Sequence, residues 1–338
     1  MHPDLTALAA PRLGVFTARE AVRTGYRPDE IRSELSSGHW CWLRRGVHVR
    51  AQDLAHAESD ARLRHLVDGI AVLLCLAPGP VLSQASAARV HRLVLPGHVD
   101  GTVRLTDARQ WRRGRDDVVT RASLPDGDLV GLLDFAVTGP GRTLVDCARE
   151  WGVEDAVVAM DAALRSGLVD RQDLRAAVLR ATHWVGVGDA ARAFGLADGR
   201  AESPLESRGR LALVEAGLPR PELQVEVHGP RGLVARVDAW YEEAGVAVEF
   251  DGRVEYLDPV GGREPGEVLW REKRREDRLR ELGIRVVRLV QEDVAPRRRR
   301  ELAVRVGALL AEPMTGPAFP CRPHCRTGWG RAAVAASS

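Results

Sequence analysis

Three acidic residues, Asp238, Glu249 and Asp251, lie within apolar runs of the segment ARVDAWYEEAGVAVEFDG at 235–252. The alternation of apolar and polar side chains in this segment predicts a β-hairpin. Because successive side chains of a strand point to opposite faces, Glu249 and Asp251 are expected on one face. A carboxylate among apolar neighbours costs free energy, so the three acids are candidates for a functional site.

The expected pairing of the hairpin brings two of these acids together. A turn centred between Glu243 and Ala244 places Asp238 opposite Glu249, with side-chain bases about 5 Å apart. Two ionised carboxylates at that distance repel by about 1 kcal/mol in water and by several times more when partly buried. A Mg²⁺ or Mn²⁺ ion would reverse the sign, so Asp238 and Glu249 are the predicted metal ligands.

Such an ion polarises a phosphate oxygen and lowers the pKa of a bound water that attacks phosphorus. The charge distribution suits that chemistry. Residues 201–252 hold five arginines against ten acids, whereas 271–300 hold twelve basic residues against six acids. We therefore expect metal-dependent phosphodiester hydrolysis beside a basic helix.

Two further residues could assist the metal site. Ser203, Pro204 and Glu206 open a helix as N-cap, first position and third position after the cap. Glu206 either closes this capping box or extends toward the metal. Asp251, before Gly252, either assists the metal ligands or begins a turn.

The surrounding elements are expected to form an α/β domain with a central mixed sheet, because a helix, a hairpin, a helix and a strand follow one another. The expected strands lie at about 222–228, 233–241, 246–251 and 285–290, with a second helix at about 267–282.

Residues 201–295 resemble the very-short-patch-repair-like branch of the PD-(D/E)XK nuclease superfamily. The runs that carry the resemblance are ESPLESRGRLALVEAGLPRPELQVEV, RVDAWYEEAGVAVEFDG and REKRREDRLRELGIRVVRL. The resemblance implies that Asp238 and Glu249 are the two metal-binding acids and that Glu206 is the acid of the first helix. Asp251 stands where the superfamily has its lysine. The catalytic function of that lysine is either lost or supplied by Lys273, the only lysine of the chain, which could equally lie on a solvated helix face.

The N-terminal residues predict a winged helix-turn-helix. Thr17 and Glu20 form a capping box that starts a helix near residue 18, and Gly25 ends it. A second helix is expected from Pro28 to Gly38, followed by a two-stranded wing at 40–49. Six residues of the second helix and the wing are candidates for DNA contacts: Arg27, Arg32, Ser33, Ser36, Arg44 and Arg45. The alternative is a helical subdomain with a solvated basic face.

Residues 12–180 resemble the AbiEi type of antitoxin and transcriptional regulator, through the runs at 14–50, VLSQASAARVHRL and VTGPGRTLVDCAREWGVEDAVVAMDAALRSGLV. This resemblance implies operator binding, autoregulation and a toxin-antitoxin system, and it names no active site. Helices are expected near 60–76, 84–92, 141–150, 153–166 and 171–180, with strands around 101–106 and 117–122. Ser83, Ser86, His91 and Cys147 are interpreted as capping and packing residues.

The cysteines, the N-terminal residues and the apolar runs indicate the cellular compartment of the protein. Five cysteines without a regular framework, and an N-terminus without a cationic flank before a long apolar run, predict a cytoplasmic protein without disulfides. The apolar run at 70–77 is too short to span a bilayer, so no membrane association is expected. Cys321, His324 and Cys325 lack a second ligand cluster for zinc, and the segment from Pro313 onward is expected to be disordered.

The expected architecture is therefore multidomain α/β. It comprises a winged helix-turn-helix at 1–55, an α/β middle domain at 56–197, a restriction-endonuclease-like domain at 198–312 and a tail at 313–338. The expected function is that of a DNA-binding, Mg²⁺-dependent endonuclease. The alternative is an antitoxin-like regulator whose nuclease fold is inactive. Expected partners are DNA, a partner toxin and a second copy of the chain in a homodimer.

Overall fold

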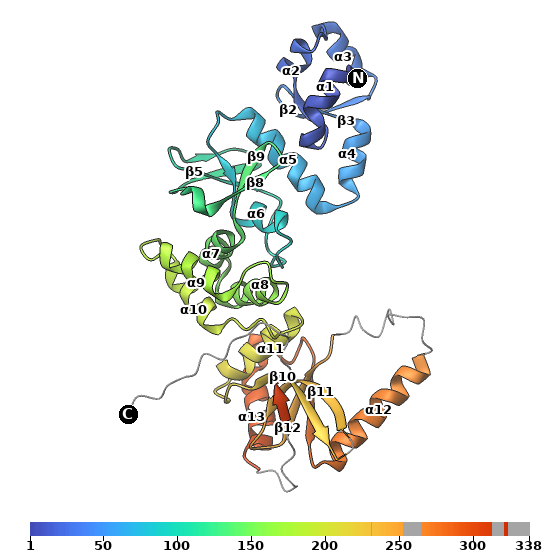
Figure 1. Cartoon of the computed structure of the whole chain (residues 1–338), viewed down its shortest axis with the longest axis vertical. Helices are drawn as coiled ribbons and strands as arrows, with labels where there is room; N and C mark the ends of the chain where they lie inside the picture. The colour runs from blue at the N-terminus through green and yellow to red at the C-terminus, as the bar shows by residue number, and fades with distance from the viewer. Residues whose placement is uncertain (231, 253–264, 313–320, 324–338) are drawn as a thin grey trace. The chain divides into compact units, whose positions relative to one another are not determined.

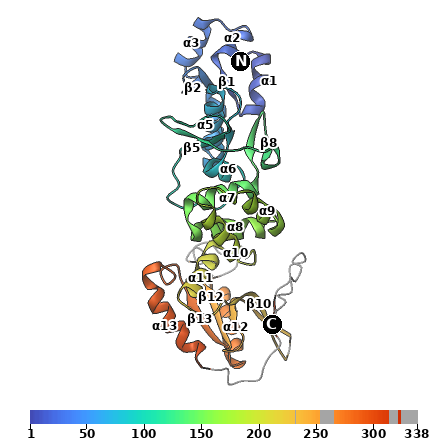
Figure 2. The same cartoon turned by 90° about the vertical axis from the view of Figure 1, so that its left-hand side faces the viewer.

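The computed structural model describes residues 1–230, 232–252, 265–312 and 321–323, of which 265–272 and 321–323 are described by their backbone alone. The chain is mixed α/β and forms two compact units divided between Ala197 and Asp198 (Figures 1 and 2). None of the helices in the described part of the chain is long and apolar enough to cross a membrane.

The first unit begins with short helices and a three-stranded antiparallel sheet of order β1-β3-β2. The elements are α1 (Pro3–Ala9), β1 (Val15–Thr17), α2 (Ala18–Arg23), α3 (Pro28–Ser36), β2 (Trp40–Arg44) and β3 (Val47–Arg50). The capping box is formed, because the Thr17 N–H donates to Glu20 Oε2 at 2.7 Å and the Glu20 N–H donates to Thr17 Oγ1 at 3.1 Å. The two helices and the hairpin thus lie where the sequence predicts them.

The remainder of the first unit contains a six-stranded mixed sheet of order β6-β7-β5-β4-β9-β8 and seven α-helices. The strands are β4 (Val81–Leu82), β5 (Val103–Asp107), β6 (Arg112–Arg113), β7 (Asp117–Arg121), β8 (Leu129–Leu132) and β9 (Phe135–Thr138). The helices are α4 (Ala51–Glu58), α5 (Ala61–Cys75), α6 (Gln84–Val90), α7 (Pro140–Trp151), α8 (Val153–Arg165), α9 (Arg171–Arg180) and α10 (Val187–Leu196). Helix α5 packs on both sheets, since Ile70 joins the core with Val15 and Val49 whereas Val72 joins the core with Leu82.

The second unit is a three-layer structure around a five-stranded sheet of order β13-β12-β11-β10-β14. Strands β12 and β13 are parallel and the other neighbours are antiparallel. One core cluster joins the sheet to α11 and α13, and a second cluster joins it to α12 (Figure 1). The elements are α11 (Pro204–Glu215), β10 (Glu222–Gly229), β11 (Gly232–Tyr241), β12 (Val246–Phe250), α12 (Pro265–Glu281), β13 (Arg285–Leu289), α13 (Arg299–Leu310) and β14 (Cys321–Pro323).

The C-terminal segment differs from expectation in one respect. Residues Cys321–Pro323 form strand β14, which pairs antiparallel with Val225–Val227 of β10, where disorder was predicted. This pairing covers the backbone groups of β10 that would otherwise form an open sheet edge. The rest of the predicted tail, including His324 and Cys325, lies outside the described residues.

Candidate functional site

The alternation of side chains along β10 and β11 breaks at one point. Leu223 and Ala239 are paired and join the core cluster on the α11 and α13 side, whereas the next pair, Val225 and Val237, joins the cluster on the α12 side. Between these pairs Gln224 has a φ of 52°, in the left-handed region that a residue with a side chain rarely adopts. Both strands therefore change face at this position, and Asp238 is the residue opposite Gln224.

The Gln224 side chain joins two carboxylates at this break. Its Nε2 donates to Glu206 Oε2 at 2.9 Å and to Asp238 Oδ1 at 3.2 Å. The other Asp238 oxygen, Oδ2, accepts a hydrogen bond from the Phe250 N–H at 2.9 Å. Strands β10, β11 and β12 and helix α11 thus all contribute to one small polar cluster.

Helix α11 places Glu206 against this cluster. The Glu206 N–H donates to the Ser203 Oγ at 3.1 Å, so Ser203 caps the helix as predicted. In a capping box, the Glu206 side chain would also accept from the Ser203 N–H. Glu206 Oε2 instead accepts from the Glu202 N–H at 2.8 Å and from Gln224. Gly209, one turn further along, lets the helix approach β12 closely, because a Cβ at this position would overlap the Phe250 ring.

Burial makes the charged form of both acids costly. Glu206 is 6% exposed, and desolvation raises the pKa of its carboxyl to about 7, with a further rise from the neighbouring Asp238 charge. Desolvation also raises the pKa of Asp238, although hydrogen bonds from the Phe250 N–H and Gln224 oppose that rise. A buried acid and a half-buried acid with raised pKa values are thus held side by side, which makes the cluster a candidate functional site.

The cluster fits a hard divalent cation. The Gln224 Oε1 is buried and has no hydrogen-bond partner among the described residues, which leaves one amide oxygen unsatisfied beside two carboxylates. Carboxylate and amide oxygens are the ligands that Mg²⁺ and Mn²⁺ prefer, and Mg²⁺ usually retains several waters. Within the described part of the chain, no three or more His, Cys, Asp or Glu residues are grouped so that they could hold a metal. The Gln224 oxygen would become a third protein ligand beside Glu206 and Asp238 if the amide turned over, because its nitrogen faces the two carboxylates here.

The strand register around the other predicted metal ligand agrees with the expectation from sequence. Ala239 pairs with Val248 and Trp240 pairs with Ala247, but the pairing ends there and does not extend to Asp238 and Glu249. The two carboxylates contact different partners. Asp238 contacts Gln224 and the Phe250 N–H, whereas Glu249 contacts arginines.

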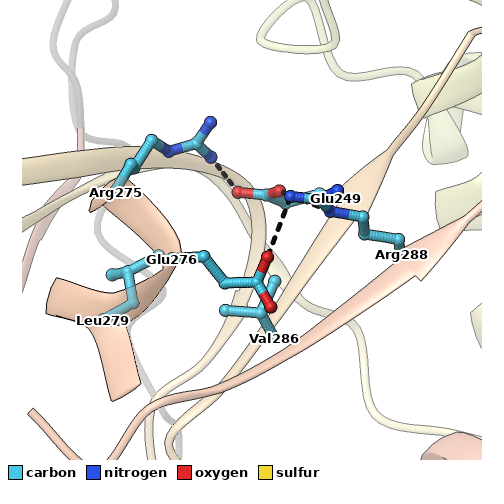
Figure 3. Close-up of a pocket in the computed structure, with 6 residues that line it drawn as sticks. All are labelled: Glu249, Arg275, Glu276, Leu279, Val286 and Arg288. Carbon is cyan, nitrogen blue, oxygen red and sulfur yellow. Dashed lines mark hydrogen bonds and ion pairs between the residues drawn. The ribbon is translucent and has the colours of Figure 1, made fainter. Parts of the chain in front are cut away.

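Glu249 lies in a small pocket beneath α12 (Figure 3). Its Oε1 accepts from an Arg275 guanidinium nitrogen, and its Oε2 lies 3.7 Å from Arg288 Nε. Arg288 also donates to Glu276 at 3.1 Å. The charge of Glu249 is thus balanced by two guanidinium groups, one from α12 and one from β13.

The two remaining candidates of the second unit are Asp251 and Lys273. Asp251 follows β12, is half-buried, and donates its N–H to the Leu289 carbonyl at 2.9 Å. Lys273 is exposed. The residue of α12 that contacts Glu249 is Arg275, which is 37% exposed. The positive charge of Arg275 lowers the pKa of Asp238, whereas burial raises it.

The candidates for DNA contacts in the first unit fall into two groups. Arg32, Ser33, Ser36 and Arg45 are exposed. Arg27 is exposed and lies 3.1 Å from Asp29. Arg44, in contrast, donates to the buried Asp117 at 3.1 Å, so that its guanidinium is engaged within the fold.

The residues interpreted as packing groups contact the interior of the first unit. His65 Nε2 lies 2.8 Å from Ser86 Oγ, and the Thr106 hydroxyl donates to Ser83 Oγ at 2.8 Å. His91 Nε2 lies 2.7 Å from the Thr138 carbonyl oxygen. These contacts engage Ser83, Ser86 and His91 within the fold, and Cys147 is buried.

Comparison with known proteins gives relatives without an established activity. No family model matches the chain. The uncharacterized proteins MT2308 and Rv2248 of Mycobacterium tuberculosis, strains CDC 1551 / Oshkosh and ATCC 25618 / H37Rv, are each 38% identical over 157 residues, 46% of this chain. The match spans 55% of the length of each relative. The crystal structure of the RV2827C protein from Mycobacterium tuberculosis is similar with a TM-score of 0.35 and 19% identity, over 56% of this chain and 77% of that chain.

Proposed function

We propose that the second unit binds Mg²⁺ or Mn²⁺ through Glu206 and Asp238 and hydrolyses phosphodiester bonds of DNA. The observation that carries the proposal is a buried acid, Glu206, and a half-buried acid, Asp238, that share the Gln224 amide, whose own oxygen has no hydrogen-bond partner among the described residues. Stability does not favour two desolvated carboxylates side by side, whereas a divalent cation would stabilise both.

The bound ion would polarise a phosphate oxygen and acidify a water. The residues of the chain would do the rest. Without the ion, burial raises the pKa of the Glu206 carboxyl to about 7, so cation binding would release a proton from it near neutral pH. Arg275 and Arg288 present two guanidinium groups that can transfer from Glu249 to the oxygens of a phosphate, which guanidinium binds in a bidentate manner. Arg275 would thereby supply the positive charge that the superfamily's lysine provides.

The order of elements in the second unit supports a restriction-endonuclease-like fold, since a helix, three antiparallel strands, a helix and a parallel strand follow one another. In the first unit, α2, α3 and the β2–β3 hairpin have the order of a winged helix-turn-helix. Its exposed Arg32, Ser33 and Ser36 would contact DNA and deliver the nuclease to its substrate.

The proposal is tested by incubating supercoiled plasmid and single-stranded DNA with the purified full chain in Mn²⁺. The wild type should cleave at least one of these substrates. Asp238→Asn should abolish the cleavage, and Asp277→Asn, an exposed acid of α12, should leave it unchanged. Cleavage that persists in Asp238→Asn would refute the assignment of the site.

A second function is favoured by one observation, the neutralisation of Glu249 by Arg275 and Arg288. In an antitoxin-like regulator these ion pairs would stabilise a nuclease-like domain that no longer hydrolyses DNA. The domain would then serve as a scaffold for binding or dimerisation. That function predicts duplex binding by the first unit with neither cleavage nor saturable cation binding.

A further inference from the structure

Two tryptophans of the first unit expose most of their side chains. Trp42 on β2 and Trp111, directly before β6, are each 65% exposed. An exposed indole is costly in water, and tryptophans on a surface are enriched where a partner binds. Neither ring is required for the core, because neither belongs to a buried cluster of the described residues.

A single buried carboxylate holds the two segments that carry these rings. Asp117 accepts from Arg44 at 3.1 Å and from Arg112 at 2.7 Å, and its side chain is 0% exposed. Arg44 is two residues from Trp42, and Arg112 is adjacent to Trp111. The β2–β3 hairpin and the β6–β7 hairpin are therefore fixed at one anchor point, although they belong to different sheets.

The exposed residues of both hairpins are mainly basic. Arg45 and Arg113 are exposed and have no ion-pair partner among the described residues. Arg115 is 94% exposed and lies 4.0 Å from Asp116, which is also exposed. Asp117 is buried and pairs with Arg44 and Arg112. It therefore does not balance the exposed positive charges of Arg45, Arg113 and Arg115. We call the set Trp42, Arg45, Trp111, Arg113 and Arg115 the tryptophan–arginine surface.

We propose that the tryptophan–arginine surface binds single-stranded nucleic acid. Unpaired bases stack on exposed aromatic rings, and arginines bind the intervening phosphates, a combination characteristic of single-strand binding. A duplex offers its phosphates to the arginines but keeps its bases stacked inside, so the tryptophans would add little to duplex affinity. The positive charge favours a polyanion over an apolar protein partner. This surface goes beyond the proposed duplex contacts of α3 and rests on the proposed association with DNA.

Fluorescence anisotropy of the full chain in EDTA, with a labelled oligothymidine strand and with a labelled duplex, tests the inference. Trp42→Ala and Trp111→Ala should each weaken single-strand binding by at least about fivefold, the loss of one stacked base. Trp111→Phe should recover part of the affinity, because a phenyl ring still stacks. Arg113→Ala should weaken binding and reduce its dependence on salt. The matched controls on α9, Leu179→Ala and Arg175→Ala, should bind as the wild type does.

The inference is overturned if both tryptophan variants bind the single strand within about twofold of the controls, which would leave the surface to a protein partner. Normal duplex binding without single-strand binding by the wild type would also overturn it, and would leave the proposed contacts of α3 intact. Binding of neither nucleic acid would refute both the surface and the proposed association with DNA.

Discussion

The carboxylates of Glu206 and Asp238 share one hydrogen-bond donor, the side-chain amide of Gln224. Glu206 comes from α11 and Asp238 from β11, so the fold brings together two acids from separate elements in a place with little solvent. Each carboxylate also accepts one backbone N–H, from Glu202 and from Phe250, but these neutral donors do not cancel the repulsion between two ionised acids held side by side. We attribute this arrangement to a divalent cation that binds both acids.

The side-chain amide of Gln224 should contribute more to the local stability of β10 and β11 when Glu206 and Asp238 are both ionised. In Gln224→Gly the left-handed backbone at φ 52° is relaxed by glycine, so any loss of stability reports the missing amide. We expect the opening free energy of the β10 and β11 amides, measured by hydrogen exchange, to fall by about 1–3 kcal/mol at about pH 8. Mn²⁺ should restore most of this loss. Unchanged exchange would show that the amide does not hold the acids.

Arg275 should compete with a bound cation. Arg275→Ala removes a guanidinium that contacts Glu249 and whose charge acts on Asp238. We expect Mn²⁺ to bind the variant at least about fivefold more tightly than the wild type. The reason is that the variant lacks roughly 1 kcal/mol of repulsion between the guanidinium and the cation. Arg278→Ala removes an exposed arginine of the same helix and should change the affinity little. Equal affinities in the two variants would place the cation away from Arg275.

Glu206 should make the free energy of unfolding depend on pH. The pKa of its carboxyl is about 7 in the folded chain against an ordinary value of 4.5. Between these values the folded state holds a proton that the unfolded state has released, so stability falls as pH rises from 4.5 to 7. The loss is on the order of 3 kcal/mol at most. Without metal, Glu206→Gln should flatten this part of the profile.

Urea unfolding of the full chain at a series of pH values, with wild type and variant compared at each, measures that effect. Glu243→Gln, an exposed acid of the same unit, is the control and should follow the wild-type profile. A Glu206→Gln profile that is parallel to the wild type over the whole range would show that Glu206 titrates normally in the folded state.

Local signals in the sequence predicted much of this structure. The capping box of Thr17 and Glu20 located α2, and Ser203 with Pro204 located α11. The turn position predicted the register in which Ala239 pairs with Val248, because alternation in an antiparallel hairpin leaves few alternatives. These features depend on residues close in sequence, which is why they could be inferred.

The composition of the site could not be inferred in the same way. Gln224 is the one uncharged polar residue in the run ELQVEV, which is a signal, but its role arises from a left-handed backbone and a change of face in two strands. Likewise, α12 is charged on most sides, so its pattern did not indicate that Arg275 rather than Lys273 would face Glu249. Such choices depend on tertiary packing.

Arg32 should contribute to duplex binding by the first unit if α3 contacts DNA. Arg32→Ala should weaken binding to different duplex sequences by similar factors and reduce the slope of log affinity against log salt by about 1. Arg27→Ala should have a smaller effect, because Arg27 already lies 3.1 Å from Asp29. Arg175→Ala, on α9, should leave both quantities unchanged. A salt slope that is equal in all four proteins would exclude α3 from the interface.

The central claim is that Glu206 and Asp238 hold a divalent cation, and the most direct test is to titrate Mn²⁺ into the full chain. The free ion would be followed by electron paramagnetic resonance. The account predicts saturable binding of about one Mn²⁺ per chain. Asp238→Asn should abolish it, Glu206→Gln should weaken it by about tenfold or more, and Asp277→Asn should not change it. No saturable binding by the wild type, or equal binding by all four proteins, would contradict the claim.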